Sequence, residues 1–205
     1  NQRRDDVPAE IMLAVRPQKA HHVLPELKFR RDHHLISLIA TLSREEVTGL
    51  TAPASRVTKA LPMPMIARRL GATIIYPPDR DVSALFGELG KVIEVESSSE
   101  FDALSVVTAT YASYFKYLDT IHRWLKAHDV PDTRGRDYIA ALFMALGHAS
   151  ETAPEADFTH LAQDYATRGG INEQVLNELT AHNVFNALAE SLDGVHRRIS
   201  AAGAA

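Results

Sequence analysis

The 205-residue sequence contains no cysteine, which excludes disulfides and thiol chemistry. No apolar run approaches the roughly 18 residues of a membrane-spanning helix. The formal charge of −4 argues against a nucleic-acid binder, because such proteins normally carry a basic face. A hydrophobic content of 45% with 23% charged residues is ordinary for a globular protein. We therefore expect a soluble, cytoplasmic protein that binds neither nucleic acid nor a membrane.

Several motifs of catalysis and cofactor binding are also absent. There is no H-E-x-x-H spacing, and the adjacent pairs His21-His22 and His33-His34 do not project onto one helical face, so we expect no metal site. There is no G-x-S-x-G elbow of a serine hydrolase. No G-x-G-x-x-G turn follows the first apolar run, so the motifs alone do not establish that a dinucleotide binds.

The first half of the chain alternates between strand and helix patterns. A helix or helical turn is expected over 19–29, with Pro25 as a possible break, and a helix over 43–50 with a capping box of Ser43 and Glu46. A third helix is expected to end at Gly90. Short apolar runs predict strands over 11–15, 34–40, 56–61, 72–77 and 91–96. This alternation predicts a mostly parallel sheet, either half of a doubly wound nucleotide-binding fold or a small α/β domain.

After the serines at 97–99 the strand patterns stop. Helices are expected over 101–129, 134–150, 157–167, 171–183 and 184–200. The change of period predicts two domains, residues 1–97 and residues 98–205. The expected helix over 101–129 is apolar on more than one stripe and needs cover on several sides, which indicates a partner subunit.

Two segments could bind an anion. Arg16 and Pro17 follow the first expected strand, and ligands of open α/β sheets bind beyond the carboxyl ends of strands. Gly169 and Gly170 precede an amphipathic helix, where bare backbone N–H groups can hold an anion. A solvated arginine and a loop that needs positive φ are the alternatives.

The order of these features resembles the pyrroline-5-carboxylate reductase family along nearly the whole chain. The stretches that carry the resemblance are IMLAVRPQ, HLISLIA, ALPMP, LFGELGKVIEVE, FDAL, the long helix and RGGINEQVLNEL. The resemblance implies the second half of a Rossmann-type doubly wound sheet followed by a C-terminal helical dimerisation domain, an α/β plus all-α chain. The family's glycine-rich turn would lie upstream of Asn1, in a part of the Rossmann domain absent from this chain. The family reduces imines with NAD(P)H, and its helical domains interlock in a homodimer.

The resemblance also implies cofactor contacts with NADP or NAD. Ala14, Val15, Arg16 and Pro17 match the family's Ala-Val-Lys-Pro stretch, which lines the cofactor. The segment 61–65 stands at the family's Met-Pro-Asn-Thr-Pro, beside the nicotinamide, so Pro62 and Met63 are expected to contact it. The family's Asn and Thr are lost there, together with their polar contacts.

Two further segments are implied to bind the substrate. Thr108 to Tyr114 stands at the family's Ser-Gly-Ser-Gly-Pro-Ala-Tyr, where only Tyr114 is identical. Thr108 is expected to contact the substrate and Thr110 to take part in catalysis through its hydroxyl. Tyr111 replaces a glycine and is expected to fill part of the substrate space.

The segment Thr167-Arg168-Gly169-Gly170-Ile171-Asn172 matches the family's Ser-Pro-Gly-Gly-Thr-Thr, which holds the substrate carboxylate. Backbone N–H groups from Gly169 onward would bind that carboxylate, Thr167 would assist, and Arg168 would add a cation. Asn172 replaces the threonine that contacts the imine region and is the second expected catalytic residue. Glu173 departs from the family and either caps the helix or pairs with a basic substrate.

We therefore expect hydride transfer to the C=N bond of a cyclic imino acid or a similar small anionic substrate. The alternative is a non-catalytic or substrate-divergent dimeric NAD(P)-binding protein. A β-hydroxy acid dehydrogenase is a third possibility, but Lys116 lies at least a turn late in the helix for that chemistry.

Overall fold

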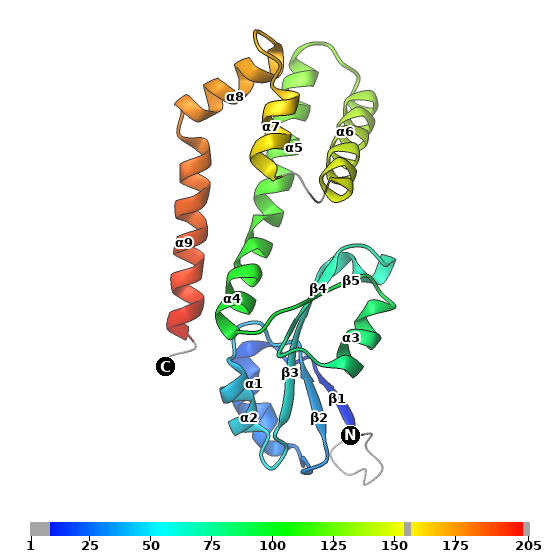
Figure 1. Cartoon of the computed structure of the whole chain (residues 1–205), viewed down its shortest axis with the longest axis vertical. Coiled ribbons are helices and arrows are strands. Elements are labelled where there is room, and N and C mark those ends of the chain that lie inside the picture. The colour runs from blue at the N-terminus through cyan, green and yellow to red at the C-terminus, as the bar shows by residue number, and fades with distance from the viewer. Residues whose placement is uncertain (1–8, 154–156, 203–205) are drawn as a thin grey trace. The chain divides into compact units, whose positions relative to one another are not determined.

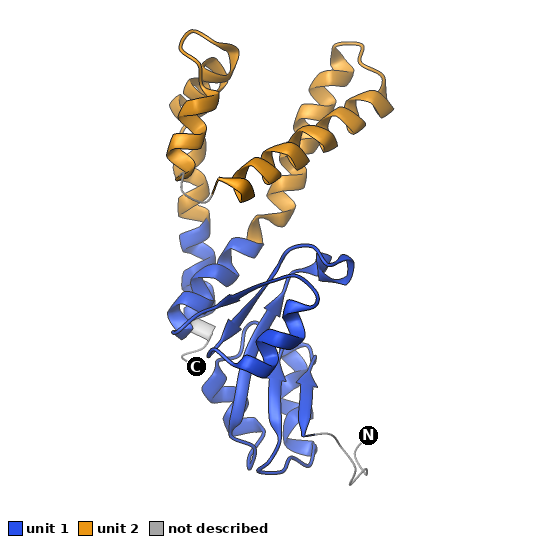
Figure 2. Cartoon of the chain, turned by 45° about the vertical axis from the view of Figure 1, so that its right-hand side comes forward, with its two compact units in different colours: residues 1–108, 192–205 blue, residues 109–191 orange. Residues whose placement is uncertain are grey.

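The computed structural model describes residues 9–153 and 157–202. The chain forms two compact units, residues 1–108 with 192–205, and residues 109–191 (Figure 2). The domain boundary that the sequence predicts after residue 97 remains a prediction. The two units are described separately.

The first unit contains one five-stranded sheet (Figure 1). Its strands lie in chain order: β1 Glu10–Leu13, β2 His34–Ser37, β3 Arg56–Pro62, β4 Ala72–Tyr76 and β5 Lys91–Glu94. The pairs β1–β2, β2–β3 and β4–β5 are parallel, and β3–β4 is antiparallel. The expected fold class is confirmed.

The antiparallel fourth strand departs from the parallel arrangement expected from alternating strands and helices. A parallel connection needs about a dozen residues or more. The connection between β3 and β4 instead contains only the short 3-10 helix η2, Pro64–Arg68. Arg69 at φ 58° and Gly71 at φ 88° then turn the chain back. A hairpin therefore replaces a crossover at this point.

Four helices belong to the first unit: α1 Pro17–Val23, α2 Arg44–Leu50, α3 Arg80–Gly87 and α4 Ser98–Val107. The expected break at Pro25 is confirmed, because α1 passes into the 3-10 helix η1, Leu24–Glu26. The capping box of Ser43 and Glu46 at the start of α2 is also confirmed. The expected end of α3 at Gly90 is wrong: Glu88 is its C-cap, and the N–H of Leu89 donates to the carbonyl of Phe86 at 2.9 Å.

The two faces of the sheet carry separate apolar clusters, because side chains alternate along each strand. On one face Leu35 and Val57 pack with buried residues of α1 and α2. On the other, Ile36 and Ile75 pack with α3. Phe101 of α4 packs with Ile74 and Val95 in a third cluster. The sheet is thus covered on both sides.

The expected single helix over 101–129 is wrong. The chain forms α4, the 3-10 helix η3 Thr108–Thr110, and α5 Tyr111–Ala127. The Ser105 hydroxyl donates to the Phe101 carbonyl at 2.6 Å, and the Thr108 hydroxyl donates to the Ser105 carbonyl at 2.7 Å. Such side-chain bonds compete with the regular helix ladder, and a tighter turn forms here.

The second unit is helical. After α5 come α6 Asp132–Thr152, α7 Phe158–Tyr165, α8 Ile171–Ala181 and α9 Val184–Ala202, the last of which extends into the first unit. No residue of α5, α7 or α8 is buried in the described chain. Phe115 is 63% exposed, Trp124 59% and Phe158 76%. The cover that the apolar long helix was expected to need is not supplied by the described residues of this chain.

No helix in the described ranges combines the length and the apolar character needed to cross a membrane.

Candidate functional site

The two segments expected to contact the cofactor, 14–17 and 61–65, lie at one edge of the sheet. Leu13 pairs with Ser37, and Ser37 pairs with Lys59, so β1 and β2 end beside the middle of β3. The segment 14–17 leaves β1 at this carboxyl edge, and Pro62 ends β3 on the same side. The sheet therefore places both segments at the edge where open α/β folds bind ligands.

Arg16 is the cationic residue of the first segment. It is the N-cap residue of α1, and its carbonyl accepts the N–H of Lys19 at 2.8 Å. Arg16 is exposed. Within the described part of the chain its guanidinium forms no ion pair or hydrogen bond. Ala14 is exposed, and Val15 and Pro17 are half-buried. An exposed guanidinium without a carboxylate partner can bind a phosphate or a carboxylate.

Met63 has a role within the hairpin. Its N–H donates to the Ala72 carbonyl at 3.1 Å, and its sulfur accepts the Ala72 N–H at 3.4 Å. A Cβ on Gly71 would lie 3.0 Å from that sulfur. The thioether is thus turned toward the β3–β4 connection, and Pro62, also half-buried, is the remaining side chain of this expected segment.

The segment 108–111 contains one hydroxyl without a partner. Thr108 donates to Ser105, as described above, so its hydroxyl is engaged, and Thr110 is half-buried. The Tyr111 hydroxyl is shielded from solvent and has no hydrogen-bond partner among the described residues. Burial raises the pKa of Tyr111, which keeps its hydroxyl protonated.

The segment 167–172, which we call the glycine segment, connects α7 to α8. Gly169 has φ 74°, a conformation that favours glycine. The N–H of Gly170 donates to the Thr167 carbonyl at 2.8 Å. A Cβ on Gly170 would approach that carbonyl oxygen to 2.8 Å. The two glycines are therefore required by the tight turn itself.

The resemblance implied that the N–H of Gly169 would be open to a ligand, but in the structure it is not. It donates to Oε2 of Glu173 at 2.6 Å, a short charge-assisted bond. Glu173 therefore caps the start of the helix, which was one of the two alternatives for this residue. Side-chain Nδ2 of Asn172 donates to the Tyr165 carbonyl at 3.1 Å, so this expected catalytic amide is also engaged.

Part of the helix start still offers donors. The N–H groups of Ile171, Asn172 and Glu173 precede the first helical hydrogen bond, which Gln174 makes to the Gly170 carbonyl at 3.1 Å. They have no acceptor among the residues described. Ile171 is 82% exposed, and Thr167 and Arg168 are exposed beside them.

Within the second unit of a single copy of the chain, the expected substrate residues do not lie together. Thr110 and Tyr111 stand where α5 begins. The glycine segment joins α7 to α8 at the end of the unit where α5 finishes (Figure 1). Lys116, the residue of the dehydrogenase alternative, pairs with Asp119 at 2.8 Å on α5.

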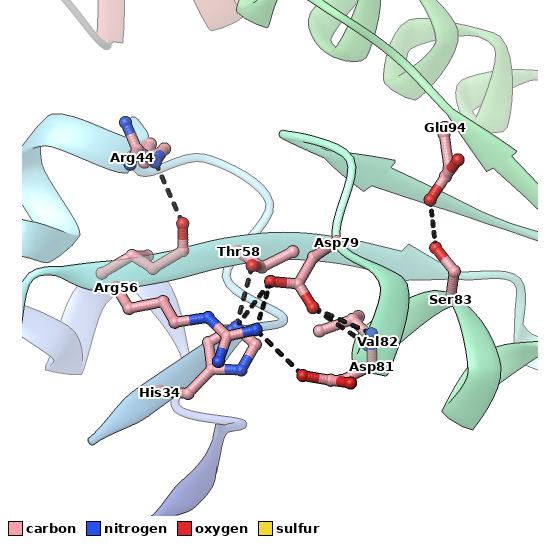
Figure 3. Close-up of polar contacts among 10 residues, drawn as sticks. His34, Arg44, Arg56, Thr58, Asp79, Asp81, Val82, Ser83 and Glu94 are labelled. Carbon is pink, nitrogen blue, oxygen red and sulfur yellow. Dashed lines mark hydrogen bonds and ion pairs between the residues drawn. The ribbon is translucent and has the colours of Figure 1, made fainter. Parts of the chain in front are cut away.

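A polar cluster that the sequence did not predict lies at the opposite edge of the sheet, around Asp79 (Figure 3). Asp79 caps α3, accepting the N–H groups of Asp81 and Val82 at 3.1 and 3.2 Å. It also accepts from Arg56 at 2.8 Å and lies 3.5 Å from Nε2 of His34.

His34 and Arg56 are the first residues of β2 and β3, so this cluster fixes α3 to the strand starts. An aspartate just before α3 is a signal that could have indicated a helix cap, but the other members of the cluster come from distant segments. No group of His, Asp and Glu residues in the described ranges could hold a metal ion.

Comparisons with known proteins were made for the whole chain. No protein-family model matches it, and no curated protein matches it by sequence. Solved structures do match. Pyrroline-5-carboxylate reductase from Coxiella burnetii superposes with a TM-score of 0.75 at 20% identity, covering 95% of this chain and 76% of that one.

Two further structures match similarly. Plasmodium falciparum pyrroline carboxylate reductase, solved with NADP bound, gives a TM-score of 0.80 at 15% identity over 95% of this chain and 77% of that one. The 1-pyrroline-5-carboxylate reductase of Streptococcus pyogenes gives 0.79 at 15% identity over 96% and 76%. The chain therefore has the fold of the pyrroline-5-carboxylate reductases over nearly its whole length.

Proposed function

We propose that this chain belongs to an NAD(P)H-dependent reductase that transfers hydride to the C=N bond of a cyclic imino acid or a similar small anionic substrate. The observation that carries the proposal is the fold match over 95% of the chain to reductases of this reaction, one of them solved with NADP. The order of sequence motifs along the chain supports the same activity.

The cofactor is NADP or NAD. The residues of the sheet edge fit a nicotinamide nucleotide, since Arg16 supplies a cation beside the carboxyl end of β1, exposed and without an ion-pair partner among the described residues. Ala14, Val15 and Pro17 would line the ligand together with Pro62 and the hairpin that Met63 closes. The bound nicotinamide would supply the hydride, and the chain would supply orientation and electrostatics.

The substrate carboxylate would bind the glycine segment. The open N–H groups of Ile171 and Asn172 and the exposed Arg168 provide donors for it, with Thr167 beside them. Gly169 and Gly170 give the turn its shape. Thr108, Thr110, Tyr111 and the Asn172 side chain would face the ring, and the Asn172 amide would exchange its bond to Tyr165 for one to the substrate.

The site would take residues from two copies of the chain. Thr110 and Tyr111 lie away from the glycine segment within one helical unit, so a second copy is needed to supply the missing half. The exposed apolar side chains of α5 to α9 provide a surface for such a homodimer.

One observation favours a non-catalytic or substrate-divergent dimer as the second candidate. The Glu173 carboxylate occupies the Gly169 N–H, which the resemblance assigns to the substrate. A carboxylate at this place repels an anionic substrate and weakens its binding.

The two candidates are separated by NADH and NADPH oxidation assays with a panel of cyclic imino acids, using the full-length protein. Cofactor binding is measured in parallel by fluorescence titration. Turnover of a cyclic imino acid supports the reductase. Tight cofactor binding without turnover of any panel member supports the second candidate.

A further inference from the structure

Lys59 is a buried cation without a hydrogen bond to any residue that the structure describes. It lies in the middle of β3, and its residue is 4% exposed. Its Nζ stands 4.5 Å from the centre of the Phe101 ring of α4. No described carboxylate lies within 4.0 Å of Nζ, and no described acceptor bonds to it. Lysine is almost never fully buried unless it is paired, so this placement calls for a reason.

The charged groups around Lys59 come from α2 and α4, two of the helices that pack on its face of the sheet. Burial lowers the pKa of Lys59, while Asp102 of α4 and Glu45 and Glu46 of α2 oppose that shift. Arg44 of α2 also faces this strand, because its Nε donates to the Val57 carbonyl at 2.9 Å. The ammonium therefore lies against an aromatic face, and no described carboxylate forms an ion pair with it.

The position of Lys59 connects two expected functional segments of the first unit. Three residues after Lys59, β3 ends at Pro62, beside Met63. The helix that carries Phe101 and Asp102 ends at Val107, beside Thr108. The contact of Lys59 with Phe101 thus joins the strand that leads to the cofactor segment with the helix that leads to the substrate segment.

We propose that Lys59 is a positioning residue, whose ammonium orients α4 on β3 and so sets Thr108 relative to Pro62 and Met63. This inference rests on the proposed function for its catalytic consequence. Apolar packing of Phe101 with Ile74 already holds α4 on the sheet. The charge adds orientation, because the ammonium is attracted to the face of the Phe101 ring and so favours one placement of α4 on β3.

This role differs from a contribution to stability. Replacing a buried charge by an apolar side chain of similar volume is often neutral or stabilising. Lys59→Met should therefore leave the midpoint of urea unfolding unchanged or raise it. It also removes the attraction between the ammonium and the Phe101 ring, so that α4 loses this constraint on its placement.

The test compares Lys59→Met with Lys59→Arg, and uses Lys91→Met on β5 as a control, an exposed lysine outside the proposed site. In Lys59→Met, kcat for 1-pyrroline-5-carboxylate should fall roughly tenfold or more, because small misplacements of reacting groups have large effects on rate. The NADPH dissociation constant should change less than about threefold, since the cofactor contacts at Arg16 are untouched. Lys59→Arg should restore kcat, and Lys91→Met should behave as the wild type.

Amide hydrogen exchange in α4 provides a readout that does not need turnover. Exchange over residues 98–107 should rise in Lys59→Met and return in Lys59→Arg. Unchanged exchange and kcat in Lys59→Met would overturn the inference, and so would parallel losses of stability, NADPH binding and kcat. If the wild type reduces no imino acid, the proposed function fails, and the exchange measurement alone decides whether Lys59 orients α4.

Discussion

At the scale of single residues, Glu173 decides how the glycine segment can bind a carboxylate. Its Oε2 accepts the Gly169 N–H at 2.6 Å, next to the open amides at the start of α8. Two carboxylates about 4 Å apart repel by about 1 kcal/mol even in water. An anionic substrate that bound here, as proposed, would bind against a resident negative charge.

Glu173→Gln removes this charge while the amide oxygen can still accept from Gly169. We expect the affinity of the NADP-loaded protein for L-proline, a cyclic amino acid probe, to rise about fivefold, which corresponds to about 1 kcal/mol. Isothermal titration calorimetry measures it. Glu178→Gln, which alters an exposed carboxylate farther along α8, is the control and should have no effect. Equal affinities for Glu173→Gln and the wild type would show that the carboxylate binds elsewhere.

The buried histidines make stability depend on pH. Burial lowers the pKa of His34, with Arg56 acting in the same direction and Asp79, Glu10 and Asp81 opposing it. Burial lowers the pKa of His33 as well. Since both are harder to protonate in the folded state, their stability contribution is complete above the ordinary value of about 6.5 and is lost as the pH falls below it.

The free energy of unfolding should therefore decrease as the pH falls from about 6.5 through the folded-state pKa values. His34→Gln should reduce this slope, and His21→Gln, at an exposed position on α1, should leave it unchanged. Urea unfolding at a series of pH values measures the slope. A slope that is identical in the wild type and His34→Gln would contradict the assignment.

At the scale of elements, the sequence predicted what is specified locally. The strands of 34–37 and 56–62 follow from short apolar runs, and the cap of α2 follows from Ser43 and Glu46. The direction of β4 was not predictable from its own residues, because it depends on the short connection before it. The break at Thr108 depends on hydroxyl bonds that an apolar pattern does not reveal.

The candidate site was also predictable only in part, because several of its contacts are not specified by the local sequence. The resemblance located Gly169 and Gly170, and the structure explains them by a positive φ and a close backbone approach. It did not predict that Glu173 would accept the Gly169 N–H, nor that Lys59 would lie against Phe101. Both contacts depend on side-chain orientations that only the folded chain defines.

The start of α4 offers a test at this scale. Ser97 accepts the Glu100 N–H at 3.2 Å, and its own N–H donates to the Glu100 carboxylate at 3.3 Å. Loss of such a cap costs about 1 kcal/mol. Ser97→Ala should lower the free energy of unfolding by about that amount, whereas Ser99→Ala, at an exposed position inside the helix, should not. Urea denaturation compares the two, and equal stabilities would show that the cap does not support α4.

At the scale of the whole molecule, the described part of the helical unit leaves several large apolar side chains exposed. Phe115 on α5 is 63% exposed, and Tyr138 and Met144 on α6 are 68% and 74% exposed. Exposed apolar patches of this kind mark protein interfaces. The proposed homodimer would account for both this surface and the separation of Thr110 from the glycine segment.

Phe115→Asp places a charge on that surface and should convert the dimer to a monomer, which analytical ultracentrifugation detects. It should also abolish turnover, because the proposed site takes residues from two copies. Leu85→Asp, at a 42% exposed position on α3 of the first unit, is the matched control and should remain dimeric. A wild-type protein that sediments as a monomer would refute the two-copy site.

The activity itself is tested most directly by following the hydride. The full-length protein is incubated with 1-pyrroline-5-carboxylate and with NADPH or NADH deuterated at the hydride-donating carbon, and the product is analysed by NMR. The account predicts that deuterium appears on the ring carbon that formed the imine double bond. Bound cofactor without deuterium transfer to this or any other cyclic imino acid would contradict it.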